Sequence, residues 1–120
     1  MKSFYAHHIS CSHDDDVFNI GLADDEFDPV DFVILSRFEE AGTSPDEQIG
    51  LLVNDSELEF KNAIVLIRCF DMQVVIELST DVAEELEYDS IHIELTEQRD
   101  EVRQALKTLL RGSSIPLKFN

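Results

Sequence analysis

The stretch AIVLIRCFDMQVVIELSTDVAEELEYDSIHIEL, residues 63–95, decides the fold class of this chain. Its first part, 63–70, is a continuous run rich in Ile, Val and Leu, which is typical of a central strand covered on both faces. Asp71 is the only polar residue before a second strand over 72–78, whose apolar residues alternate with polar ones. This spacing predicts a tight antiparallel hairpin.

The hydrophobic period then changes from two residues to about 3.6. Capping side chains at 79–81 begin a short helix that continues to about Glu87. A strictly alternating strand follows over 90–95, and Thr96 then caps a longer helix that ends at Gly112. The apolar residues of this longer helix recur at i, i+3, i+4, i+7 and i+8: Val102, Ala105, Leu106, Leu109 and Leu110.

The first half of the chain reads as strands separated by acidic turns, and we expect them over 4–9, 16–23, 32–38 and 48–53, with a loop over 41–46. Together these elements predict one α+β domain over 1–120, with 112–120 as a tail or a short strand at 115–119. We expect a largely antiparallel, curved sheet with a short helix and a longer C-terminal amphipathic helix packed on one face.

Charge excludes several classes of partner. The chain has 26 acidic residues against 9 Lys and Arg, a net charge of −17. Residues 98–120 carry five basic and two acidic residues, a balance of +3, so residues 1–97 hold the remaining −20. Nucleic acids and anionic membrane surfaces are polyanions that such a chain repels. The composition favours a soluble domain or one that meets a basic protein.

We expect the protein to be cytoplasmic. No segment reaches the roughly 18–20 apolar residues of a membrane span, and the first residues contain no apolar stretch of signal-peptide length.

A cluster rich in imidazole and thiol groups lies near the N-terminus. Zinc prefers such nitrogen and sulfur ligands, but the spacing matches no recognised zinc motif. The alternative is a polar strand end that runs into an acidic turn at Asp14, Asp15 and Asp16. The candidate metal ligands are His7, His8, Cys11 and His13.

A second cluster of carboxylates lies over 24–31. Its first three alternate carboxylates are spaced like those of a calcium-binding EF-hand loop. However, Pro29 stands where that loop needs Gly, and Leu35 stands where it needs a bidentate Glu. Two interpretations remain, a solvated acidic turn or a protein-binding loop with an aromatic anchor. The binding candidates are Asp24, Asp25, Glu26, Phe27 and Asp28.

Nothing in the sequence favours catalysis. There is no Gly-x-Ser-x-Gly elbow, and none of the four glycines forms the Gly-x-Gly arrangement of a phosphate-binding loop. We therefore expect no enzyme and no cofactor. A metal-dependent or thiol enzyme built on the N-terminal cluster is the least favoured alternative.

Several segments resemble one known family. Gly21-Leu22-Ala23-Asp24-Asp25-Glu26, followed by Pro29 and then FVILSR at 32–37, resembles the N-terminal half of the immunity protein 10 family of bacterial polymorphic toxin systems. The order of the later elements, from Glu77-Leu78 through the closing helix, is also similar. The resemblance covers roughly residues 4–112, but the His- and Cys-rich start departs from it, so nothing is transferred to residues 7–13.

The resemblance implies a cytoplasmic protein that binds and neutralises the C-terminal domain of a cognate toxin, and many toxins of this kind are nucleases. An acidic protein suits that role because a nuclease cleft must be basic to receive phosphates. The expected contacts are the carboxylates around Phe27, with those of the turn at 14–16. The alternative is an acidic interaction or structural module without a toxin partner, which leaves a homodimer open.

Overall fold

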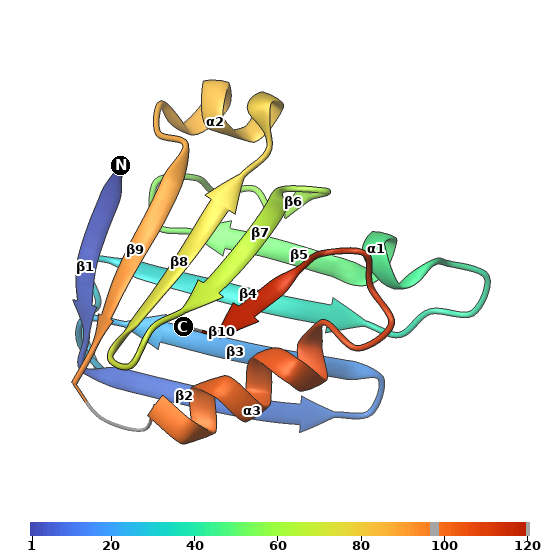
Figure 1. Cartoon of the computed structure of the whole chain (residues 1–120), viewed down its shortest axis with the longest axis horizontal. Helices are drawn as coiled ribbons and strands as arrows, with labels where there is room; N and C mark the ends of the chain where they lie inside the picture. The colour runs from blue at the N-terminus through green and yellow to red at the C-terminus, as the bar shows by residue number, and fades with distance from the viewer. Residues whose placement is uncertain (97–98, 120) are drawn as a thin grey trace.

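The computed structural model describes residues 1–96 and 99–119 of the chain. The described residues form two five-stranded sheets and three helices (Figure 1). Sheet A has the order β1 (Lys2–Ala6), β9 (Ser90–Leu95), β8 (Gln73–Leu78), β7 (Ile64–Cys69) and β10 (Leu117–Phe119). Sheet B has the order β2 (His8–Asp14), β3 (Val17–Ala23), β4 (Phe32–Phe38), β5 (Ile49–Val53) and β6 (Phe60–Lys61).

The mixed α and β content is as expected, but the prediction of a single curved sheet is wrong. The segment predicted as one strand over 4–9 divides at the exposed His7, where the chain leaves sheet A and enters sheet B. The strands on the two sides of this break, β1 and β2, both contribute to the core, since Ala6 of β1 and Ile9 of β2 are buried. A continuous strand could not serve two sheets whose strands run across one another (Figure 1).

The two sheets differ in how their strands pair. Sheet B is antiparallel throughout, and each of its strands pairs with the next along the chain. Sheet A is antiparallel at its centre, but both of its edges are parallel pairs, β1 with β9 and β10 with β7. The strands near the two ends of the chain therefore form the edges of sheet A.

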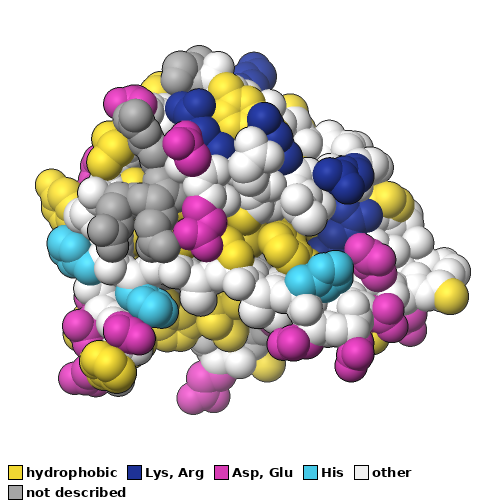
Figure 2. Space-filling model, turned by 90° about the horizontal axis from the view of Figure 1, so that it is seen from below, with side chains coloured by type: hydrophobic (Ala, Val, Ile, Leu, Met, Phe, Trp, Pro, Cys, Tyr) yellow, Lys and Arg dark blue, Asp and Glu magenta, His cyan; other side chains and the backbone are white. Residues whose placement is uncertain are grey.

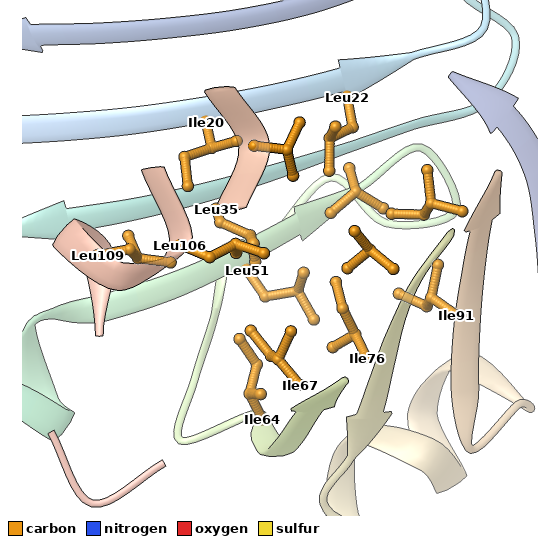
Figure 3. Packing of buried hydrophobic residues seen from close by; sticks show 14 of the residues in the cluster. Ile20, Leu22, Leu35, Leu51, Ile64, Ile67, Ile76, Ile91, Leu106 and Leu109 are labelled. Atoms are coloured by element: carbon orange, nitrogen blue, oxygen red, sulfur yellow. The ribbon is translucent and has the colours of Figure 1, made fainter. Parts of the chain in front are cut away.

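The core lies between the inner faces of the sheets. In sheet B it includes Ile20, Leu22 and Leu35, and these side chains point toward those of Ile67 and Ile76 in sheet A (Figure 3). Alternation places apolar residues on one face of each strand, as in β9, where Ile91, Ile93 and Leu95 are all buried.

Helix α3 (Arg99–Leu109) completes the core near β2 and β3 (Figure 1). The predicted apolar stripe is buried: Val102, Ala105, Leu106, Leu109 and Leu110. The longer helix predicted from Thr96 to Gly112 is not found, because α3 has 11 residues and the other helices are shorter still. Residues 110–112 form a turn instead, in which Gly112 has a φ of +78°. Residues 97–98, at the predicted beginning of the helix, lie outside the described part.

Arg37 holds this early end of α3. It extends from β4 toward the core side and donates hydrogen bonds from Nη1 to the carbonyl oxygens of Leu109 (2.9 Å) and Arg111 (2.6 Å). Its Nε donates to Oε1 of Gln48 at 3.1 Å. The last carbonyls of a helix have no partner within the helix, so the half-buried Arg37 guanidinium satisfies two carbonyls here and opposes the negative end of the helix dipole.

The two short helices differ locally from the prediction. The loop expected over 41–46 contains the start of α1 (Pro45–Gln48), which Ser44 and Glu47 begin with a reciprocal capping box. The capping-side-chain prediction for α2 (Thr80–Leu86) is not met, because Ser79 is its N-cap and makes no side-chain capping hydrogen bond. The end of α2 is as expected, at Glu87, which has a φ of +68°.

The prediction that the strand over 63–70 is covered on both faces is wrong. In β7, Val65 is 54% exposed on the outer face of sheet A, and Arg68 on the same sheet forms a 3.2 Å ion pair with Glu77 of β8. The continuous apolar run reflects a bulge between Ile64 and Leu66, which lets Leu66 and Ile67 both become buried.

Candidate functional site

The most distinctive surface feature is the segment 24–31 between β3 and β4, which we call the acidic loop. Its first two carboxylates hold its shape. Oδ1 of Asp24 accepts a hydrogen bond from the backbone N–H of Val30 at 2.9 Å, and the Asp24 N–H donates to the carbonyl of Asp31 at 3.0 Å. Oδ2 of Asp25 accepts from the N–H groups of Phe27 and Asp28 at 3.2 and 2.8 Å. The loop is therefore built around its own carboxylates, as in Asx turns.

The outer part of the acidic loop offers charge and apolar surface together. Phe27 is 88% exposed and Val30 is 71% exposed. The exposed side chains of Glu26 and Asp28 take no part in the hydrogen bonds that hold the loop. These four side chains are thus available to a partner, and two of them, Phe27 and Val30, are large apolar side chains exposed on one short loop.

A polar cluster anchors the C-terminal end of the acidic loop. Lys2, at the start of β1, donates from Nζ to Asp31 at 3.0 Å and to Asp55 at 2.9 Å, although its own side chain is only 8% exposed. The hydroxyl of Tyr88 also donates to Asp55, at 2.9 Å. The cluster ties the loop to sheet A and to the turn after β5.

The same contacts change the acidity of their members. The hydrogen bond from Lys2 lowers the pKa of Asp55, and the hydrogen bond from Tyr88 lowers it further. Burial raises the pKa of Tyr88, and the hydrogen bond to Asp55 and its negative charge raise it further. Asp55 is therefore a carboxylate and Tyr88 a neutral donor at neutral pH.

The second predicted acidic element, Asp14, Asp15 and Asp16, lies in the β2–β3 hairpin. All three residues are exposed, and Asp15 has a φ of +51° in the turn. This turn is at the opposite end of β3 from the acidic loop, and the seven residues of β3 span roughly 20 Å. The structure thus does not bring the two predicted acidic elements together into one site.

The predicted metal ligands are also separated. The ring of His7, in the break between the sheets, stacks on Tyr5 at 6.2 Å between centroids. The ring of His13 meets Phe18 edge-on at 5.8 Å. Within the described residues, no three His, Cys, Asp or Glu side chains are grouped so as to hold a metal ion.

Both cysteines are free thiols. Burial raises the pKa of Cys11, and the charge of Glu101 and a hydrogen bond to it raise the pKa further. Burial raises the pKa of Cys69 to about 11. Neither environment produces the thiolate that a nucleophilic cysteine needs.

The positive charge is gathered elsewhere. Arg103 and Lys107 of α3 lie over the ring of Phe119 in β10, at 5.4 and 5.1 Å from its centroid. Seen from the side of α3 and β2, Lys and Arg side chains gather over one part of the surface, and most Asp and Glu side chains lie toward the opposite border (Figure 2). The separation of charge found in the sequence is thus also a separation in space.

The anchor of the acidic loop was not predicted from the sequence. Lys2, Asp31, Asp55 and Tyr88 are far apart along the chain, and no short motif contains them. The sequence contains one signal, since Lys2 is one of only four basic residues among the first 97, which hold 24 acidic residues.

No family model and no curated protein matches the chain. Among the described residues, no helix is long and apolar enough to cross a membrane.

Proposed function

We propose that this protein is an immunity protein, which binds the C-terminal domain of a cognate bacterial toxin in the cytoplasm and blocks its basic active-site cleft. The observation that supports this most directly is the acidic loop, in which carboxylates surround an 88% exposed Phe27 on a backbone held by Asp24 and Asp25. The family resemblance of residues 21–37 includes this loop.

The physical basis is occlusion. A toxin that cleaves RNA or DNA needs a basic cleft for the phosphates of its substrate, and a protein of net charge −17 competes for that cleft. Complementary charge also accelerates encounter, which suits an inhibitor that must act before the toxin does. Because the loop is already structured, its ordering costs little on binding. No bond is made or broken, so the mechanism uses no catalytic residue and no cofactor.

The test is binding to the C-terminal domain encoded by the gene next to this one. Glu26→Lys/Asp28→Lys reverses two charges that do not hold the loop, whereas changes at Asp24 or Asp25 would also disturb its backbone. At about 0.15 M salt we expect the double variant to raise Kd about tenfold or more, the equivalent of about 1.4 kcal/mol. Calorimetry or surface plasmon resonance measures the change.

The matched control is Glu39→Lys/Glu40→Lys, which makes the same change of charge at exposed positions beyond the far end of β4. It should leave Kd within about twofold. Equal losses in the two double variants would show a general charge effect and contradict the assignment to the acidic loop. A neighbouring domain that does not bind the unaltered protein, or that keeps its toxic activity when bound, would contradict the proposed function itself.

A further inference from the structure

A hollow of about 340 Å³ lies on the outer face of sheet B, directly beside the acidic loop. It is lined on one side by His8 of β2 and on the other by Phe32 and Ile34 of β4, with Gly21 and Ala23 of β3 between them. Pro29 and the loop residues before it close one end. Its walls are therefore mainly apolar, whereas the acidic loop beside it is charged.

The register of sheet B explains the hollow. Ala23 pairs with His8 on one side and Phe32 on the other, and Gly21 pairs with Ile34. Small side chains thus stand in the middle strand, between larger ones on its neighbours, and all of these point to the same outer face. A Cβ on Gly21 would lie 2.8 Å from Oγ of Ser10, so a side chain at this position would clash with Ser10 and would fill part of the hollow.

The charge at the rim identifies the kind of occupant. Asp25 and Glu26 are part of the lining, and Phe27 and Asp28 follow them in the same loop. Of the described residues that line the hollow, none is Lys or Arg. An apolar floor with an acidic rim is complementary to an apolar side chain that has basic neighbours.

We propose that this hollow receives an aromatic or branched apolar side chain of a partner protein, presented between Lys or Arg residues that meet the acidic loop. This inference rests on the proposed function, because it takes the partner to be a basic protein, and it adds the point at which the partner is anchored. Anchors of this kind supply much of the affinity of an interface, and the charges around them supply orientation and rate.

Two other occupants are conceivable, one from the same chain and one from a second copy of it. Phe27 is exposed at the edge of the hollow and could fold into it. In a second copy, Phe119 lies beneath Arg103 and Lys107 and has the chemistry of the proposed anchor. The second copy is disfavoured because each chain carries a net charge of −17.

The experiment compares two peptides, Lys-Lys-Phe-Lys-Lys and Lys-Lys-Ser-Lys-Lys, by NMR titration of the labelled protein at about 0.01 M salt, where the Debye length is about 30 Å. We expect both peptides to shift the amides of the acidic loop. Only the Phe peptide should shift those of Gly21, Ala23 and Ile34, and it should bind about fivefold or more tightly than the Ser peptide, since an aromatic side chain is buried.

Ala23→Leu fills the hollow and should abolish the difference between the peptides while leaving the binding of the Ser peptide unchanged. Asn19→Leu is the matched control, because it adds the same side chain to the outer face of β3 outside the residues that line the hollow. This control should keep the difference. Thermal unfolding of each variant shows whether the fold is retained.

Equal affinity of the two peptides for the unaltered protein, with no shifts in β3 or β4, would overturn the proposal. Tighter binding of the Phe peptide to Phe27→Ala would assign the hollow to Phe27 instead. Peptide-independent shifts that grow with protein concentration and disappear in Phe119→Ser would assign it to a second copy. In each case the effect of Glu26→Lys/Asp28→Lys on the toxin domain is measured separately, so the proposed function can stand when this inference fails.

Discussion

Arg37 shows how one residue can connect distant parts of the fold. It lies in a strand of sheet B, yet its guanidinium satisfies two carbonyls at the end of α3, about 70 positions further along the chain. In the sequence it is a single charge at the end of an apolar run, and nothing there indicates a helix end as its partner. The end of α3 could not be predicted from Gly112 alone, because the Arg37 contacts stabilise the turn that begins before it.

Replacing this residue tests its role. We expect Arg37→Met to lower the free energy of unfolding by about 2–3 kcal/mol, because it keeps the aliphatic packing but removes two charge-assisted hydrogen bonds, of which the one to Leu109 is partly buried. Urea unfolding measures the loss. Arg68→Met is the control, since the Arg68 side chain is 44% exposed and its ion pair with Glu77 should be worth less than about 1 kcal/mol. Similar losses in the two variants would contradict a special role for Arg37.

At the scale of elements, the end of α2 carries local strain. Glu87 has a φ of +68°, a left-handed conformation that Gly adopts readily and that a residue with a Cβ adopts at a cost. Its N–H donates to the carbonyl of Ala83 and closes the last turn of the helix. The sequence predicted this end but not its conformation, because Glu is not a usual helix-ending residue.

Glu87→Gly should therefore stabilise the protein by about 0.5–1 kcal/mol, despite the greater freedom of Gly in the unfolded chain. Glu84→Gly makes the same chemical change in the interior of α2 and should destabilise by about 1 kcal/mol. Thermal unfolding of the pair gives the two signs directly. A loss of stability in both variants would mean that the Glu87 side chain contributes more than its backbone costs.

Strands were predicted best where one face is buried. The bounds of β4 and β9 match the predicted 32–38 and 90–95, since a period of two residues is imposed by the alternation of core and outer face. The turn over 24–29 also followed from its Asp and Pro residues. In contrast, the anchor of the acidic loop at Lys2 joins side chains 29 and 53 positions apart and has no local signal.

At the scale of the whole molecule, strands could be predicted but their partners could not. Nothing local distinguishes a strand of sheet A from one of sheet B, so the sequence suggested one sheet where there are two. The break at His7 lies in a pair of histidines between the apolar Ala6 and Ile9, and nothing in these four residues indicates a change of sheet. The strand predicted over 16–23 already lay between the acidic loop and the turn at 14–16, and β3 keeps these two acidic elements apart.

The parallel edges of sheet A predict an order of folding. Sheet B is a succession of neighbouring hairpins, whereas β1 can pair only with β9, and Lys2 lies opposite Ile91. The entropy lost on closing a loop grows with its length, so short-range hairpins form before such a distant pair. We expect sheet B to be a folding intermediate or nucleus, with sheet A completed last.

Pulse-labelling hydrogen exchange during refolding should therefore protect the amides of β3 and β4 before those of β1 and β9. Simultaneous protection of all four strands would contradict this order. If it holds, the acidic loop forms between two strands that are already paired, while its anchor at Lys2 arrives only with the last strand to join. The surface offered to a partner would then become rigid in the final step of folding. A chain in which β1 has not yet paired would meet its partner with an acidic loop that lacks the Lys2 anchor at Asp31.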